Sequence, residues 1–460
     1  MDRSSAHRTL IALVLALALL VVACTPTSDT TTSTPPPSTS TTEPSTTEPP
    51  TTETPSATTL GTIPGNASDS LDPALVARMR EELAELALVT EQVRGLPFLT
   101  APEVTILDEP EFADRVSTLI ADELDEVELA TDARYLTMLG LLEPGSDLYT
   151  LWIDLYTEQV GGFYDGETKE LVVPAAADGF TSLQRITVVH ELVHALSDQH
   201  FDFNDEFERR FDEGNGDDAA AFQALIEGDA THSQLVHMEE LSPAEALAAA
   251  VESLSIDTTI LDSVPAWMQA DLFYPYQQGL NFTEHLVSEG GLAAVDRAYQ
   301  QQPDTTEQVL DPVKYLRDER PRDLPALTAS LAGWDVHDEG SFGEWGLRLL
   351  FTDTLSPGLV TQVGAGWGND HYRVFALGDD VGLVMHYVGD AESDAEELAD
   401  ALIAHARDTM NAGAAVESEG GLLYDTNGIY VFIDRVEDEL FFVASTDLTA
   451  GASLRTQLGL

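Results

Sequence analysis

The sequence contains one cysteine, Cys24, in 460 residues. A chain with a single thiol forms no intramolecular disulfide and offers no cysteine-rich metal site. Basic residues are also scarce, because 21 Lys and Arg stand against 81 Asp and Glu, for a formal net charge of -60. This charge repels nucleic acid, which is therefore excluded as a partner, and it is typical of a well-solvated surface. A D-x-D-x-D-G loop that would favour calcium binding is absent from the sequence.

The N-terminus carries an apolar run at residues 11–23, preceded by Arg3 and Arg8. The run is too short for a membrane-spanning helix, and its basic start and small final residue are typical of an export signal. It ends in V-V-A-C, which resembles a bacterial lipoprotein signal, where the chain is cut before the cysteine and lipid is attached to the thiol. We therefore expect residues 1–23 to be removed and Cys24 to anchor an exported protein to the outer face of the cell membrane. The alternative is a chance cysteine after an ordinary signal.

The rest of the chain divides into a tether and two folded domains. Residues 24–65 are rich in Thr, Ser and Pro and cannot bury apolar area, so we expect a disordered tether. Residues 66–335 are predicted to form a mainly helical domain with a small β-hairpin, and residues 336–460 a small α+β domain. The fold class expected for the whole is therefore α+β.

Periodicity predicts the individual elements. Helices are expected at 73–93, 111–126, 132–142, 148–158, 217–238, 243–253, 266–272, 276–288, 292–300, 343–351 and 394–410. Strands are expected at 103–107, 160–164, 170–173, 372–377, 382–388, 421–424, 429–433 and 440–444. Residues 304–315 read as turn-rich, and the polar residues 201–218 as a loop.

The most informative stretch is H-E-L-V-H at residues 190–194. On a helix, His190 and His194 lie one turn apart on one face, so both imidazoles can reach one zinc ion. Glu191 can then act as general base for the attacking water. Thr181 with Gln184 fits a capping box at the start of this helix. The side chains expected to form its buried face are Ile186, Val189, Leu192, Val193 and Leu196.

A catalytic zinc needs a third protein ligand. Glu227 stands in an otherwise apolar helical segment, where a carboxylate is costly unless it is paired or metal-bound, and we predict it as this ligand. His232 is the competing candidate. Asp198 and Asp229 are candidates for accepting the second N–H of a zinc-bound histidine, and His200 is interpreted as structural.

These motifs resemble gluzincin-type zinc metallopeptidases, in which H-E-x-x-H lies on one helix and a glutamate on a second. The gap of 33 residues from His194 to Glu227 is longer than in those families. The chain is also similar to uncharacterised exported bacterial proteins classed as metallopeptidases. In that group G-F-Y-D, H-E-L-V-H-A-L-x-D-Q-H, E-G-D-A, P-Y-x-x-G and G-W-G-x-D-x-Y recur in order; here they begin at Gly162, His190, Glu227, Pro275 and Gly366.

The resemblance implies a zincin-like fold, a zinc cofactor and a peptide or protein substrate. Residues 162–164 are the expected edge strand along which the peptide would bind, and Tyr276 is the expected donor to the developing oxyanion. One alternative is a catalytically inactive surface binding or scaffold protein on the same fold. Another makes the C-terminal domain the functional part, binding a ligand or the cell envelope around residues 366–368.

Overall fold

The computed structural model describes residues 13–15, 63–212, 216–418, 421–424 and 428–459. Cys24 and almost all of the predicted signal and tether lie outside these residues. Within the part of the chain that is described, no helix has the length and apolar character needed to cross a membrane.

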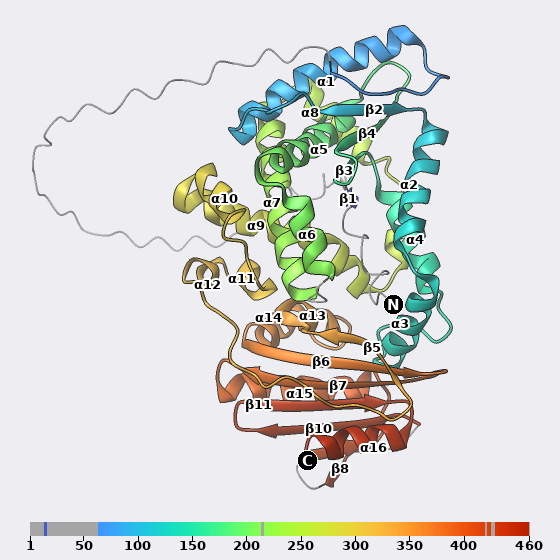
Figure 1. Ribbon diagram of the computed structural model, residues 1–460, viewed down its shortest axis with the longest axis vertical. Coiled ribbons are helices and arrows are strands. Elements are labelled where there is room, and N and C mark those ends of the chain that lie inside the picture. Colours follow the sequence, from blue (N-terminus) through green and yellow to red (C-terminus); the bar gives the residue numbers. More distant parts are fainter. Residues whose placement is uncertain (1–12, 16–62, 213–215, 419–420, 425–427, 460) are drawn as a thin grey trace, which may run out of the picture.

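Helices dominate the N-terminal part of the molecule (Figure 1). They are α1 (Pro73–Arg94), α2 (Glu109–Glu123), α3 (Glu126–Met138), α4 (Leu148–Gln159), α5 (Ser182–Phe201), α6 (Phe203–Asp212), α7 (Gly216–Glu240), α8 (Pro243–Ser253), η1 (Leu261–Ser263), α9 (Ala266–Gly290), α10 (Leu292–Ala298), α11 (Thr306–Leu310) and α12 (Pro312–Leu316). A small sheet with the order β1-β3-β4-β2 lies beside α5; its strands are β1 (Leu13–Leu15), β2 (Glu103–Leu107), β3 (Phe163–Asp165) and β4 (Glu170–Pro174).

The expected hairpin is present, since β3 and β4 pair antiparallel, while β2 and β4 run parallel. The predicted edge strand differs from the expectation. In the full chain β1 pairs antiparallel with β3, with Val14 opposite Tyr164, so β1 forms the edge of the sheet. Residues 162–164 become the edge only when β1 is removed.

The C-terminal part contains an antiparallel sheet whose described strands follow the order β5-β6-β7-β11-β10-β9-β8. The strands are β5 (Asp335–Gly340), β6 (Trp367–Leu377), β7 (Asp380–Gly389), β8 (Val416–Ser418), β9 (Gly421–Tyr424), β10 (Tyr430–Val436) and β11 (Glu439–Ser445). Four helices accompany them: α13 (Gly343–Leu350), α14 (Pro357–Gly364), α15 (Glu392–Asp408) and α16 (Leu448–Gln457).

The period of two along a strand divides this sheet between two cores. Val431 and Ile433 of β10 belong to the core that contains α15, whereas Tyr430 and Phe432 belong to the opposite core with Leu454 of α16. The core on the α15 side also contains side chains of α2, α4 and α9. The two predicted domains therefore share one continuous apolar core.

The α+β class is confirmed, and most predicted helices and strands are found within a few residues of their expected bounds. The two helices predicted at 266–272 and 276–288 are instead one helix, α9, with Pro275 inside it. A proline removes one backbone hydrogen bond, and packing of α9 along α7 compensates for that loss. Strands β1, β5 and β8, the short helix η1 and the helices α14 and α16 were not predicted, and residues 304–315 form the short helices α11 and α12 rather than turns alone.

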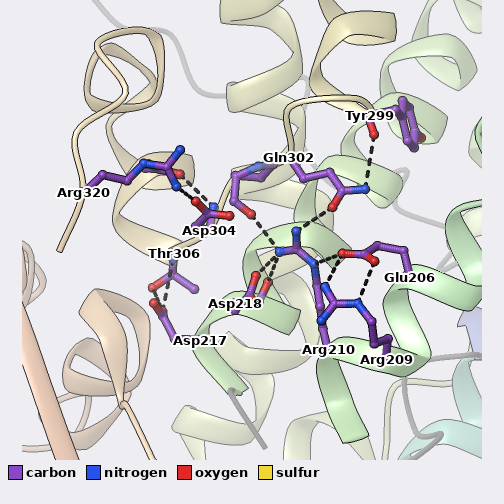
Figure 2. A network of polar contacts seen from close by, with 12 residues as sticks. Glu206, Arg209, Arg210, Asp217, Asp218, Tyr299, Gln302, Asp304, Thr306 and Arg320 are labelled. Atoms are coloured by element: carbon purple, nitrogen blue, oxygen red, sulfur yellow. Dashed lines mark hydrogen bonds and ion pairs between the residues drawn. The ribbon is translucent and has the colours of Figure 1, made fainter. Parts of the chain in front are cut away.

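The polar segment predicted as a loop at 201–218 contains helix α6 (Figure 2). Phe203 and Phe207 are buried on one side of α6, which makes the helix amphipathic. Arg210 donates to Glu206 at 3.0 Å and to the carbonyl of Pro303 at 3.0 Å. It also forms an ion pair with Asp218, at the start of α7. These contacts fix α6 between α7 and the chain that follows α10.

Candidate metal centre

Helix α5 carries the H-E-x-x-H motif and begins as predicted. Thr181 Oγ1 accepts a hydrogen bond from Gln184 N at 3.2 Å, and Gln184 Oε1 accepts one from Thr181 N at 3.0 Å, which completes the capping box. All five side chains of the predicted apolar face are buried. The cap and this face fix the rotation of α5, and with it the direction of the two histidines.

The three predicted ligands, His190, His194 and Glu227, come together beneath the surface, each with 1% of its area exposed. Glu227 reaches them from α7. Its Oε2 atom lies 3.1 Å from His190 Nε2 and 3.5 Å from His194 Nε2. Within the described residues, His194 Nε2 is buried without a hydrogen-bond partner. Burial lowers the pKa of His194, which favours the neutral imidazole, the form that binds metals.

These separations fit a zinc ion. In a tetrahedral site with bonds of about 2.0–2.2 Å, neighbouring ligand atoms lie about 3.3–3.5 Å apart. The two distances to Glu227 Oε2, 3.1 and 3.5 Å, are close to this value, and the buried Nε2 of His194 has the orphaned lone pair that a metal would occupy. Two imidazoles and one carboxylate are also one of the donor sets found in catalytic zinc sites.

Glu191 lies between the motif histidines in the sequence and next to β3 in space. Its side chain is fully buried, and its Oε2 atom accepts the backbone N–H of Tyr164 at 2.8 Å. This bond fixes the carboxylate against the strand that was predicted to bind substrate. Because the donor is a backbone N–H, a substitution of the Tyr164 side chain would leave this hydrogen bond between Glu191 and β3 in place.

The partner of His190 was not predicted. His190 Nδ1 lies 2.9 Å from Gln234 Oε1, so the Nδ1–H tautomer donates to this amide and leaves Nε2 free to face Glu227. Gln234 follows Glu227 by seven residues on α7, which is two helical turns and the same face. That spacing is the signal in the sequence that would have identified it.

The two aspartates considered for this role do not serve it. Asp198 accepts the Tyr164 hydroxyl at 2.6 Å and Lys169 Nζ at 2.7 Å. Asp229 is fully buried and accepts from Arg94 Nε at 2.9 Å, and also from the hydroxyls of Ser197 and Tyr299. Asp198 therefore joins α5 to the β3–β4 hairpin, and Asp229 joins α7 to α5 and α1, rather than contacting the histidines.

The remaining histidines of this region take no part in the group. His232 is half-buried on α7 and lies outside the three-residue cluster. His200 contacts the carbonyl of Pro97 at 2.7 Å, in agreement with its structural interpretation. A second acidic group within the described residues, Glu307, Glu319 and Asp390, already surrounds the ammonium of Lys314 and needs no metal.

Two glycines bring α9 against α7 beside the candidate metal site. A Cβ atom on Gly228 would lie 2.1 Å from the carbonyl oxygen of Gly279, and a Cβ on Gly279 would lie 2.0 Å from the carbonyl oxygen of Ala224. The backbones of the two helices are therefore in direct contact. Tyr276, one turn before Gly279, is buried with its ring centroid 6.2 Å from that of His190. The E-G-D-A and P-Y-x-x-G motifs are therefore linked in space, because each supplies one glycine to the contact between α7 and α9.

We expect Gly279→Ala to destabilise the protein by about 1–3 kcal/mol, because a methyl group there forces α9 away from α7. Denaturant unfolding followed by circular dichroism measures the change. Gly358→Ala is the matched control, since a Cβ at Gly358 meets nothing within 4 Å. Equal unfolding midpoints for the two variants would show that the helices do not cross as closely as described.

Comparison with known proteins concerns the C-terminal part alone. Residues 331–452 match a family model described as "Domain of unknown function (DUF8575)". This range covers the sheet from β5 to β11 and leaves His190, His194 and Glu227 outside it. No curated protein and no solved structure matches the chain.

Proposed function

We propose that this chain is a zinc-dependent peptide hydrolase with a zincin-like catalytic domain. The observation that carries the proposal is the placement of the three candidate ligand atoms at zinc-compatible separations, with both histidine nitrogens 3.1 and 3.5 Å from Glu227 Oε2, on a helix that also carries Glu191. His190, His194 and Glu227 would hold the ion. The resemblance of the motifs to gluzincin-type metallopeptidases supports the same assignment.

Bound zinc supplies Lewis acidity, which lowers the pKa of water and polarises a carbonyl group. The chain supplies the proton transfers. Glu191, held by the N–H of Tyr164, takes the proton of the attacking water and delivers it to the leaving amine. Tyr276 extends from α9 toward His190, and its hydroxyl is our candidate donor to the oxyanion.

Peptide is the favoured substrate class because β3 accepts an extended segment. β1 pairs with it in antiparallel register from Leu13 opposite Asp165 to Leu15 opposite Phe163. β1 precedes Cys24, so cleavage at the proposed lipoprotein site removes it and leaves β3 as an open edge. A peptide that adds to this edge would lie next to Glu191, which contacts Tyr164 of the same strand.

On the sequence evidence we also propose that the protein is exported and attached through Cys24 to the outer face of the membrane. The tether of residues 24–65 would hold the catalytic domain away from the lipid. The strongly acidic composition of the whole chain, with a formal net charge of -60, suits a solvated location outside the cell.

The function is tested by metal analysis together with cleavage of a mixed peptide library followed by mass spectrometry. We expect about one zinc per chain and cleavage that a chelator abolishes and zinc restores, as for other catalytic zinc sites. If the protein bound no zinc, the assignment of His190, His194 and Glu227 as zinc ligands would be wrong. Stoichiometric zinc without any cleavage would favour the alternative of an inactive surface binding protein.

A further inference from the structure

A half-buried carboxylate on α9, that of Asp271, lies among aromatic side chains from three helices. Trp345 of α13 donates its indole N–H to Asp271 Oδ1 at 2.9 Å. Burial and, after it, the charge of Asp271 raise the pKa of Tyr156 in α4, so this hydroxyl also lies close to the carboxylate. The site therefore joins α4, α9 and α13, which are far apart in the sequence.

The aromatic rings of this cluster form two stacked pairs. Trp152 stacks on Tyr156 with centroids 5.3 Å apart, and Tyr274 stacks on Trp345 at 4.5 Å. Trp152, Tyr156 and Trp345 are all half-buried, so each residue keeps part of its surface accessible. The cluster thus combines aromatic faces with a negative charge.

Asp271 has no cationic partner within the described part of the chain. Burial raises its pKa, and the hydrogen bond from Trp345 offsets this in part, while no lysine or arginine contributes. A carboxylate in such surroundings is stabilised by a cation that arrives from outside. Aromatic faces attract the same ligand, and a guanidinium group can stack on a ring and hydrogen-bond to a carboxylate at once.

We propose that Asp271 and the rings of Trp152, Tyr156 and Trp345 bind a basic side chain of the substrate, arginine above all. This inference rests on the proposed peptidase function and names its substrate class as basic peptides. The acidic surface, with its formal net charge of -60, would raise the local concentration of such peptides.

The position of the cluster suits a binding subsite near the metal centre. Asp271 precedes Tyr276 by five residues on α9, about 7.5 Å along the helix axis. Helix α4, which carries Tyr156, ends at Gln159 and leads directly into β3. Because an extended peptide advances about 3.3 Å per residue, this separation along α9 corresponds to about two residues of substrate.

The test compares an arginine-containing peptide with the same peptide in which citrulline, its neutral isostere, replaces arginine. We expect the zinc-loaded wild-type protein to cleave the arginine peptide with a kcat/KM about tenfold higher, as expected for one charge-assisted contact. Asp271→Asn should remove this preference. The exposed Asp154→Asn in α4 is the matched control and should keep the preference.

A second readout is independent of activity. In the inactive Glu191→Gln protein, tryptophan fluorescence should change on adding the arginine peptide and remain constant on adding the citrulline peptide. Equal cleavage and equal binding of the two peptides by the wild type would overturn the proposal, even if Asp271→Asn failed to fold. An absence of cleavage of every peptide, with zinc bound, would instead count against the proposed peptidase function.

Discussion

Replacing Glu191 by Gln is expected to lower the rate of peptide cleavage by about 10³-fold, while the zinc content of the protein stays unchanged. General bases typically contribute about 10²–10⁴-fold to a rate, and glutamine has the same shape without a site for the proton. The amide can still accept the N–H of Tyr164, which in the wild type lies 2.8 Å from Glu191 Oε2. The fold around the site should therefore persist.

The measurement is kcat on the best library peptide, accompanied by zinc analysis and the thermal unfolding midpoint. Glu81→Gln is the control, because this substitution also removes one negative charge, at an exposed position of α1 outside the candidate site. If the Glu191→Gln protein with full zinc cleaved peptide as fast as the control, Glu191 would not be the base. The reaction would then need another proton acceptor near the three ligands.

His194→Ala is expected to weaken zinc binding by more than 100-fold. Loss of an outer partner of a metal-bound histidine typically costs about 10–100-fold in affinity, and loss of a ligand should exceed that. The Nε2 atom of His194 is buried, lies 3.5 Å from Glu227 Oε2 and has no hydrogen-bond partner within the described residues, so it has no other evident role. Competition with a zinc-binding dye gives the affinity.

His232→Ala is the control for this experiment, and it also decides between the two candidates for the third ligand. His232 is half-buried on the same helix as Glu227 but stands apart from the cluster of three. We expect its replacement to leave zinc affinity within about twofold of the wild type, because substitutions away from special sites have small effects. If His232→Ala weakened zinc binding as much as His194→Ala, His232 would be assigned as a zinc ligand instead of Glu227.

Local patterns account for the parts of the fold and site that the sequence predicted well. The capping box of Thr181 and Gln184 and the apolar spacing of α5 depend on neighbours within a few residues, so they can be read along the chain. The four-residue spacing of His190 and His194 places both on one helical face in the same way. Glu227 was recognised because a carboxylate in an apolar segment needs a partner.

The sequence predictions that differ from the structure concern features that depend on contacts between distant segments. Pro275 predicts a break, but contact with α7 keeps α9 continuous, and Gly279 is the residue that permits this contact. Polar residues 201–218 suggest a loop, but Arg210 finds its partners in α7 and after α10. The choice of Gln234 over Asp198 or Asp229 beside His190 depends on the mutual rotation of α5 and α7, which no local pattern specifies.

By itself, then, the sequence determined the α+β class. It also identified the three candidate ligands and the candidate base, because helical periodicity and motif spacing are properties of short segments. Only the tertiary structure decided that Glu227, 33 residues beyond His194, reaches both histidines. It also decided that Gln234 holds His190 and that Trp345 of α13 donates to Asp271 of α9. These relations are set by packing between helices, which is a property of the folded chain as a whole.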